Sequence, residues 1–283
     1  MARNDAKYSP SALVSITRPA GSASIAFQRA GAKTAIAHAF AASPLRLLAP
    51  RNHGDAAWVF LSNLGGGLVD GDRIQVRVDV EANATALLAT QAATKVYRSP
   101  KGCSQRLEVK VASGAAIAIV PDPVVCFSGA RYDQRIDVSL AADASLLLFD
   151  GYTSGRAARG ETWQFAHFES RTSIARDGGR AIVEATRLDP AAGPIAERMG
   201  RFRAVAWLVA SGPRFESVRE AMLAPLPAPK PGASVVFAAS RVGLDAAVVR
   251  VAAESFEAAS RALRPSFAAL ASTLGDDPFA RKW

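Results

Sequence analysis

A weak repeat with a period of roughly 30 residues runs through the middle of the chain. Each copy is a turn residue followed by small residues and an apolar run, and the turn residues are Asp55, Asn83, Gly114 and Asp143. The intervals between these successive turn positions are nearly equal. A near-constant period of this length is typical of stacked β architectures, in which each coil buries its neighbour's apolar face. A plain β-sandwich is the alternative, because its hairpins also recur regularly.

Short apolar or alternating runs between turn residues predict strands over most of the chain before residue 210. Examples are the segments 24–28, 57–61, 73–80, 84–90 and 105–111. The predicted fold class is therefore mainly β, a β-helix or solenoid-like stack of short strands with a few helices, mostly near the C-terminus.

The C-terminal pattern differs from the rest. It predicts a short helix at 217–223, a strand pair at 234–239 and 246–251, and a helical apolar stripe at 254–270. Pro265 lies inside that stripe and should kink or split the helix.

We expect one domain over residues 1–283, because no composition shift marks a second. Residues 1–20 form an N-terminal extension in this prediction. Residues 214–283 form a C-terminal part, which carries the helices and the Pro-rich connector 226–232.

The basic charge favours acidic partners without favouring nucleic acid. The formal net charge is +9, but the basic residues are spread along the chain, and the densest cluster is Arg198, Arg201 and Arg203. Aromatic residues make up 7% of the chain and fall mostly within apolar runs. Nucleic-acid binding surfaces instead interleave aromatic with basic side chains, so we expect no nucleic-acid partner.

The cysteines and the apolar runs predict a cytoplasmic protein. Cys103 and Cys126 form no CxxC pair, which favours reduced thiols. Residues 1–20 lack the apolar segment of a secretory signal, and no uncharged apolar run approaches the roughly 18 residues of a membrane span. We therefore expect no membrane association.

The glycine-rich run at 65–72 does not match a nucleotide-binding loop. Gly66 and Gly71 have the spacing of a phosphate loop, but Asp72 follows where a lysine would contact phosphate. Asp70 occupies the third glycine position of the dinucleotide fingerprint. A glycine-rich turn is the favoured interpretation.

No catalytic constellation is apparent elsewhere. His38, His53 and His167 lie far apart and lack a nearby HxH or HxxxH partner, a pattern more typical of surface or core histidines. Asp122 and Asp150 could form the carboxylate pair of a glycosidase, but nothing in the sequence brings them together, and turn capping is favoured. We expect neither an enzyme nor a tightly bound cofactor.

One polar segment stands out. Residues 90–99 read TQAATKVYRS and follow an apolar strand directly. Polar residues this dense after a buried strand indicate an interaction surface or a polar-lined interior. A solvated loop is the alternative.

Several motifs together resemble one known family. Residues 63–72 (NLGGGLVDGD) look like the GGGLxxGD signature of the UreD (also called UreH) urease accessory proteins, with Asp70 where that family often has glycine. Residues 90–99 are similar to its second signature. Further matches are PDPVVCFSGAR at 121–131, GRAARGE at 155–161, Arg264-Pro265 and the closing Arg281-Lys282-Trp283.

The resemblance implies a non-catalytic scaffold for urease maturation. Members of the family have a mostly β, helix-like solenoid fold. They bind the accessory protein UreF, reach the GTPase UreG through it, and dock onto apo-urease, so that GTP hydrolysis is coupled to nickel insertion. Nickel is then an ion in transit and not a resident cofactor.

A path for nickel should offer weak, exchangeable oxygen ligands, because a tight His/Cys cage would trap the ion. We hypothesise that the matched motifs provide such a path. Its candidate residues are Asp72, Thr90, Gln91, Thr94 and Glu161. Candidate partner-binding or motif residues are Gly65, Gly66, Gly67, Lys95, Arg156, Arg159 and Trp283.

Two alternatives are open at this point. A β-solenoid enzyme acting on an acidic polysaccharide would also suit the positive charge. Within the family interpretation, residues 254–283 carry an apolar stripe that serves as a docking face for UreF, as core packing or, as we favour, as both. The stripe is formed by Phe256, Leu263, Phe267 and Trp283.

Overall fold

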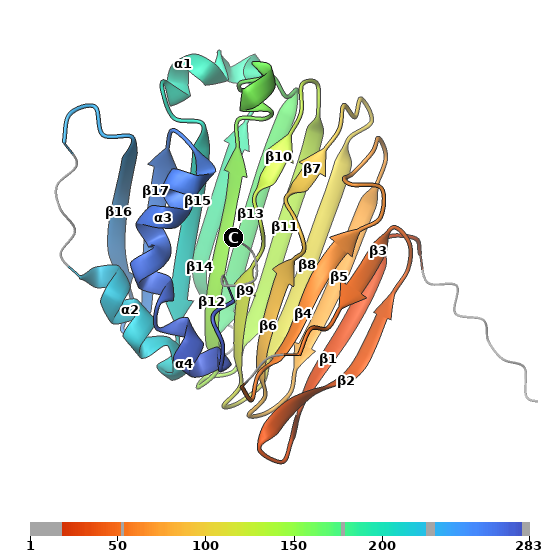
Figure 1. Cartoon of the computed structure of the whole chain (residues 1–283), viewed down its shortest axis with the longest axis vertical. Coiled ribbons are helices and arrows are strands. Elements are labelled where there is room, and N and C mark those ends of the chain that lie inside the picture. Colours follow the sequence, from red (N-terminus) through yellow and green to blue (C-terminus); the bar gives the residue numbers. More distant parts are fainter. Residues whose placement is uncertain (1–18, 52–53, 177–178, 225–229, 279–283) are drawn as a thin grey trace, which may run out of the picture.

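The computed structural model describes residues 19–51, 54–176, 179–224 and 230–278. Within these residues the strands form two sheets, which pack face to face (Figure 1). Sheet A has the order β14 (Gly179–Leu188), β13 (His167–Arg176), β11 (Arg131–Leu140), β8 (Cys103–Val111), β5 (Arg73–Val80), β1 (Ser22–Ala30) and β2 (Lys33–Ala41).

Sheet B is the larger sheet. Its order is β16 (Val235–Val242), β17 (Ala246–Ala253), β15 (Ala204–Ser211), β12 (Ser145–Thr153), β9 (Ala116–Val120), β6 (Thr85–Thr90), β4 (Ala57–Asn63) and β3 (Leu45–Leu48). Two short strands extend it beside β12, namely β10 (Val124–Cys126) and β7 (Thr94–Val96).

The chain alternates between the sheets through its central part. It passes from β4 in sheet B to β5 in sheet A, and then through β6, β8, β9, β11, β12 and β13. Neighbouring strands in these central parts of both sheets are parallel. Ala57 pairs with Ala86, Thr85 with Ala116, and Ala116 with Ser145. The spacing of paired residues is therefore the period of the sequence repeat.

The turns of the repeat also lie against one another. The backbone N–H of Asn83 donates to the carbonyl of Ser113, and the Ser113 hydroxyl donates to Asp143 Oδ2. Both Asn83 and Gly114 have positive φ, which Asn and Gly tolerate. These hydrogen bonds join successive turns at one end of the sheets.

Different burial patterns distinguish the sheets. Strands of sheet A alternate, so β5 and β11 place every second residue in the space between the sheets. Strands β6 and β9 of sheet B are buried at every position. Strands of a sheet that is covered on both faces need continuous apolar runs. In a sheet with one solvated face, apolar and polar residues alternate along each strand.

The second face of sheet B is covered by helices α2 (Glu216–Leu223), α3 (Phe256–Phe267) and α4 (Leu270–Leu274), as Figure 1 shows. Phe149 of β12 packs against Phe256 and Phe267 of α3 at ring-centroid distances of 5.9 and 5.6 Å. The apolar stripe at 254–270 is therefore core packing, and its interpretation as a docking face is wrong for Phe256, Leu263 and Phe267, which are all buried.

Most predicted elements are confirmed. The five example strands fall on β1, β4, β5, β6 and β8, the strand pair on β16 and β17, and the short helix on α2. Helix α3 ends shortly after Pro265, at Phe267, and α4 begins at Leu270, so the predicted split is present. The mainly β class with helices mostly near the C-terminus is also confirmed. Short helical turns that were not predicted are η1 (Ala157–Arg159), η2 (Pro190–Ala192), α1 (Ile195–Met199) and η3 (Pro213–Phe215).

Among the described residues, no helix combines the length and the apolar content that a bilayer crossing requires. The N-terminal extension up to residue 18, most of the Pro-rich connector, His53 and Trp283 lie outside the described residues.

Candidate functional site

The four motif segments lie side by side at one edge of the molecule. We define the motif stack as residues 63–72, 90–99, 121–131 and 155–161. Leu68 forms a parallel bridge with Val96 of β7, and Val96 pairs with Cys126 of β10. The backbone N–H of Ser128 then donates to Glu161 Oε2. Segments that are one repeat apart in sequence thus form one continuous surface (Figure 1, β7 and β10).

Glycine is required where the first two segments meet. Gly65 and Gly66 have φ values of 102° and 76°, which side chains other than glycine rarely adopt. A Cβ on Gly67 would lie 2.6 Å from the carbonyl oxygen of Lys95 and 2.8 Å from the Tyr97 ring. The glycine run therefore lets the loop approach β7 closely.

A pocket of about 150 Å³ opens between these two segments. Thr90, Gln91 and Thr94 line it, together with Asn63 and Gln105. The Ser62 hydroxyl donates to Gln91 Oε1 at 2.6 Å, which holds that side chain at the rim. The pocket thus presents hydroxyl and amide oxygens, the weak ligand type that the sequence predicts here. Further lining residues are Gly66, Gly67 and Lys95.

A second, smaller cavity lies beside the first, between the sheets. It shares Thr90, Thr94 and Gln105 with the first pocket and is also lined by Asp122 and Asp150. The buried Thr90 hydroxyl donates to Asp122 Oδ2 at 2.8 Å and accepts from the Asp122 N–H at 2.7 Å. The two cavities thus share wall residues, and the inner one borders carboxylates in the interior.

A row of buried polar side chains extends this interior. Gln134 Nε2 donates to Asp150 Oδ2 at 2.8 Å and to Ser170 Oγ at 3.2 Å. The Tyr132 hydroxyl contacts Gln134 Oε1 at 3.2 Å and Gln105 Oε1 at 3.3 Å. Burial raises the pKa of the Asp150 carboxyl to about 6, although the hydrogen bond from Gln134 opposes that rise. We call Gln105, Tyr132, Gln134, Asp150 and Ser170 the buried polar row.

Asp72 and Glu161 have other contacts. Asp72 Oδ2 accepts the Val69 N–H at 2.8 Å and so closes the turn of the glycine loop. Glu161 forms an ion pair with Arg156, which also holds the pKa of the Glu161 carboxyl below its usual range. Neither carboxylate is among the described residues that line the two cavities. The structure therefore brings together Thr90, Gln91 and Thr94 but not all five candidate path residues.

The remaining candidates lie around the motif stack. The Arg156 guanidinium lies over the Phe127 ring, 4.2 Å from its centroid, so Arg156 joins the third and fourth segments. Arg159 is exposed in η1, and the Lys95 side chain is exposed beside the pocket.

Both cysteines lie near the motif stack but are poor candidates for metal ligands. The Cys103 thiol donates to the Val69 carbonyl at 3.0 Å, and Cys126 is buried. Burial raises the pKa of both thiols, and a metal binds the thiolate form. Oxygen ligands therefore dominate this region.

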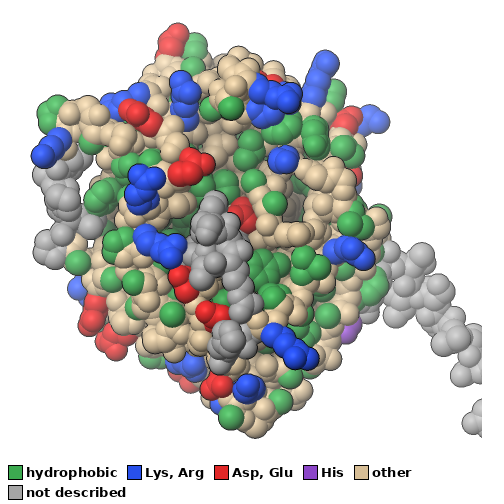
Figure 2. Space-filling model, in the orientation of Figure 1, with side chains coloured by type: hydrophobic (Ala, Val, Ile, Leu, Met, Phe, Trp, Pro, Cys, Tyr) green, Lys and Arg blue, Asp and Glu red, His purple; other side chains and the backbone are tan. Residues whose placement is uncertain are grey.

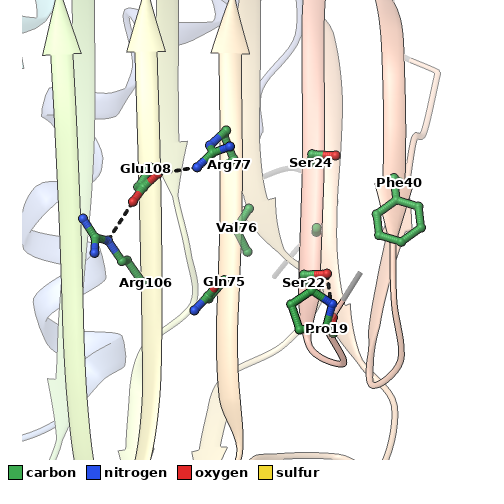
Figure 3. Close-up of a pocket in the computed structure, with 10 residues that line it drawn as sticks. Pro19, Ser22, Ser24, Phe40, Gln75, Val76, Arg77, Arg106 and Glu108 are labelled. Carbon is green, nitrogen blue, oxygen red and sulfur yellow. Dashed lines mark hydrogen bonds and ion pairs between the residues drawn. The ribbon is translucent and has the colours of Figure 1, made fainter. Parts of the chain in front are cut away.

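The outer face of sheet A carries a wider hollow of about 380 Å³ (Figure 3). Arg77 and Arg106 both reach Glu108, at 3.1 and 2.8 Å, and Arg106 also contacts Asp137. These charges compensate one another along neighbouring strands, as exposed cross-strand pairs do. Lys and Arg are likewise intermixed with Asp and Glu on the face shown in Figure 2.

Comparison with known proteins identifies the family. A family model described as "UreD urease accessory protein" matches residues 19–283. The chain belongs to the UreD family. The urease accessory protein UreD of Sorangium cellulosum is 54% identical over 264 residues, covering 93% of this chain and 85% of that protein. The corresponding protein of Anaeromyxobacter is 42% identical over 265 residues, covering 93% and 89%.

The family extends to plants. Urease accessory protein D of Oryza sativa subsp. indica is 33% identical over 210 residues, covering 72% of this chain and 69% of that protein. UreD proteins are accessory proteins of urease and not enzymes, so the chain has a role in urease maturation. The polysaccharide-enzyme alternative gains no support from the family.

Sequence reasoning missed the buried polar row, although it left a signal. Alternation in β11 directs residues 132, 134, 136 and 138 inward, and Gln134 is the polar member of that apolar set. Asp150 directly follows the apolar run 146–149. A polar residue in an otherwise apolar inward series marks a buried hydrogen-bonding group.

Proposed function

We propose that this chain is a scaffold for nickel insertion into urease, which acts with UreF, UreG and apo-urease in the cytoplasm. The family match over residues 19–283 carries the proposal. A cytoplasmic location agrees with the free thiols of both cysteines. GTP hydrolysis belongs to UreG in this scheme, which agrees with the mismatch of the glycine loop to a phosphate loop.

We also propose that the strands form the stacked coils expected for the family. Parallel pairing at the spacing of the sequence repeat in both sheets supports this view. The stack gives each motif segment the same position in successive coils, which explains how dispersed signatures form one surface.

The path for nickel starts at the motif stack in this proposal. Thr90, Gln91 and Thr94 provide the entrance, and the shared cavity walls lead to Asp122 and Asp150. A divalent ion that moves between the sheets needs ligands that offset its charge but bind it only weakly. Single carboxylates that are hydrogen-bonded to amides and hydroxyls meet that need. Asp72 and Glu161 support the entrance by shaping its loops.

The test is urease activation in cells that lack only this gene. Complementation with the wild-type chain should restore urease activity and nickel content. Asp150→Asn and Thr94→Val should restore both several-fold less well. The first removes a carboxylate charge from the path and the second removes a hydroxyl ligand, and neither changes the size of the side chain much. Asp137→Asn, on the outer face of sheet A, is the matched control and should restore activation fully.

Isolation of the accessory complex distinguishes a defect in the nickel path from a defect in scaffolding. Both variants should still be isolated with UreF, UreG and apo-urease. Full nickel loading with Asp150→Asn and Thr94→Val would overturn the path, whereas nickel-charged urease in the deletion strain would overturn the proposed function itself.

A further inference from the structure

A cluster of metal-ligating side chains lies on the outer face of sheet A, away from the motif stack. Asp133 of β11 and Glu169 of β13 are paired residues on neighbouring strands, and His167 precedes Glu169 on the same face of β13. Residues two apart on a strand share a face, so all three side chains are directed outward. Their ligand atoms lie within 4.8 Å of one another.

Asp189 fixes the imidazole from the opposite side. Its Oδ2 lies 3.5 Å from His167 Nδ1, and its Oδ1 accepts the Ala191 N–H as the N-cap of η2. That backbone hydrogen bond, together with Arg187 and His167, lowers the pKa of the Asp189 carboxyl. The ring is thus backed by an anchored carboxylate, the usual arrangement behind a metal-binding histidine.

The other ring nitrogen faces a second carboxylate. His167 Nε2 lies 3.3 Å from Asp133 Oδ1, within hydrogen-bonding distance. A neutral imidazole carries one N–H, so it can donate to only one of these two carboxylates. A cation bound between Nε2 and Asp133 Oδ1 would leave that N–H for Asp189.

The geometry suits a cation. Ligand atoms about 2.1 Å from a shared ion and adjacent in its coordination shell are roughly 3 Å apart, close to the 3.3 Å between Nε2 and Oδ1. The His167 side chain is only 14% exposed, whereas the Asp133 side chain is 60% exposed. The site therefore combines a fixed nitrogen ligand with an oxygen ligand free to adjust.

Carboxylates lie on both sides of the His167 ring. Asp133, Glu169 and Asp189 contribute three, and the basic residues around them are Arg187, Arg131 (paired with His167), Arg135 and Arg171 (paired with each other). Arg187 contacts Asp189 at 3.3 Å but lies 4.0 Å from Glu169. The Arg187 charge is thus directed mainly at the anchoring carboxylate and less at Glu169.

We propose that His167, Asp133 and Glu169 bind a divalent first-row transition-metal ion, with Asp189 as the positioning residue. One imidazole and two carboxylates form a ligand set that such ions prefer over Mg²⁺, which favours oxygen ligands alone. The site lies on the solvent side of sheet A and does not depend on the proposed path between the sheets.

Equilibrium dialysis of the tag-free full chain against Ni²⁺ or Zn²⁺ tests the site. Wild-type protein should bind one equivalent that His167→Asn lacks, and Mg²⁺ should not compete. Asp189→Asn should weaken this binding by tenfold or more, the usual effect of removing a carboxylate behind a ligating histidine. His38→Asn is the matched control, because His38 hydrogen-bonds Ser24 near the opposite edge of the same sheet.

Metal stoichiometry and affinity in His167→Asn equal to those of the wild type would overturn the site and leave only a hydrogen bond between His167 and Asp133. Far-UV circular dichroism checks that the variant folds. If it does not, Asp133→Asn carries the test, since its exposed side chain leaves the fold unaffected, and it should lose the same equivalent. Asp150→Asn should keep this equivalent, which separates the outer site from the nickel path.

Discussion

Asp150 illustrates the energetic cost of a buried carboxyl group. Its usual pKa is near 3.8, and burial between the sheets raises it to about 6. At neutral pH the folded chain therefore holds a charge that the unfolded chain would expose to water. The hydrogen bond from Gln134 recovers part of that cost.

The sign of this linkage gives a testable pH dependence. A raised pKa in the folded state means that the favourable contribution of protonation is complete below pH 4 and is lost as pH rises through 6. Asp150→Asn removes the charge, so it should raise the free energy of unfolding by on the order of 2 kcal/mol at pH 8 and much less at pH 4.5.

Urea unfolding of both proteins at the two pH values measures this difference. Asp137→Asn, on the solvent face of sheet A, should show no such dependence. An Asp150→Asn variant that is less stable than the wild type at pH 8 would contradict the buried-charge argument. The expected combination, higher stability with poorer nickel delivery, cannot arise from unfolding.

Gly67 is a second residue with a definite role. Because an added Cβ meets the Lys95 carbonyl and the Tyr97 ring, Gly67→Ala should lower the free energy of unfolding by about 1–3 kcal/mol. Denaturant unfolding measures this change. Lys95→Ala keeps the carbonyl and removes only an exposed side chain, so it should change stability by less than about 0.5 kcal/mol. Equal stabilities of Gly67→Ala and the wild type would show that the glycine loop can shift to accommodate the added Cβ without loss of stability.

Single residues also mark the limit of sequence reasoning. A lone histidine is normally a surface or core residue, and His167 has no HxH or HxxxH partner in the sequence. Glu169 lies two residues further along β13, but Asp133 comes from β11 and Asp189 from the turn after β14. Only the strand register brings them together, and register is a tertiary property.

At the level of elements, burial pattern separates the two sheets. Continuous apolar runs such as β6 indicate a strand covered on both faces, and alternating runs such as β5 indicate a strand covered on one. The sequence therefore allowed the strands to be predicted with near-correct bounds. The spacing of the turns indicated stacking at that period, but it did not give the antiparallel partners of β15, β16 and β17, which lie outside the repeat.

Helix α3 was predicted as an element, but its role was left open. Its apolar stripe faces sheet B, and the Ser255 hydroxyl accepts the Ala258 N–H to cap its first turn. An amphipathic helix beside a covered sheet and one that docks on a partner have the same sequence pattern. Packing against Phe149 decides between them.

This packing predicts a large loss of stability for Leu263→Ala. Leu263 is 2% exposed between α3 and sheet B, so its truncation should lower the free energy of unfolding by about 2–5 kcal/mol. Arg261→Ala, at an exposed position of the same helix, should change it by less than about 0.5 kcal/mol. Thermal or urea unfolding measures both, and a small effect at Leu263 would mean that the helix layer contributes little.

At the scale of the whole molecule, the motif stack explains why four dispersed segments share one family signature. Each segment occupies the same edge of a successive repeat, and backbone hydrogen bonds join them. The resemblance predicted which segments matter. It did not predict that Asp72 and Glu161 form contacts within the surface loops. Nor did it predict that Asp122 and Asp150 face the interior, because the direction of each side chain depends on the assembled sheets.

Pairing between successive repeats also bears on how the chain is made. A strand leaving the ribosome finds its partner in the segment synthesised just before it, so the sheets can lengthen as translation proceeds. The antiparallel strands β15 to β17 and helix α3 emerge last. Before these elements are synthesised, the helix-covered face of sheet B is exposed to solvent. That apolar face must then be protected against aggregation.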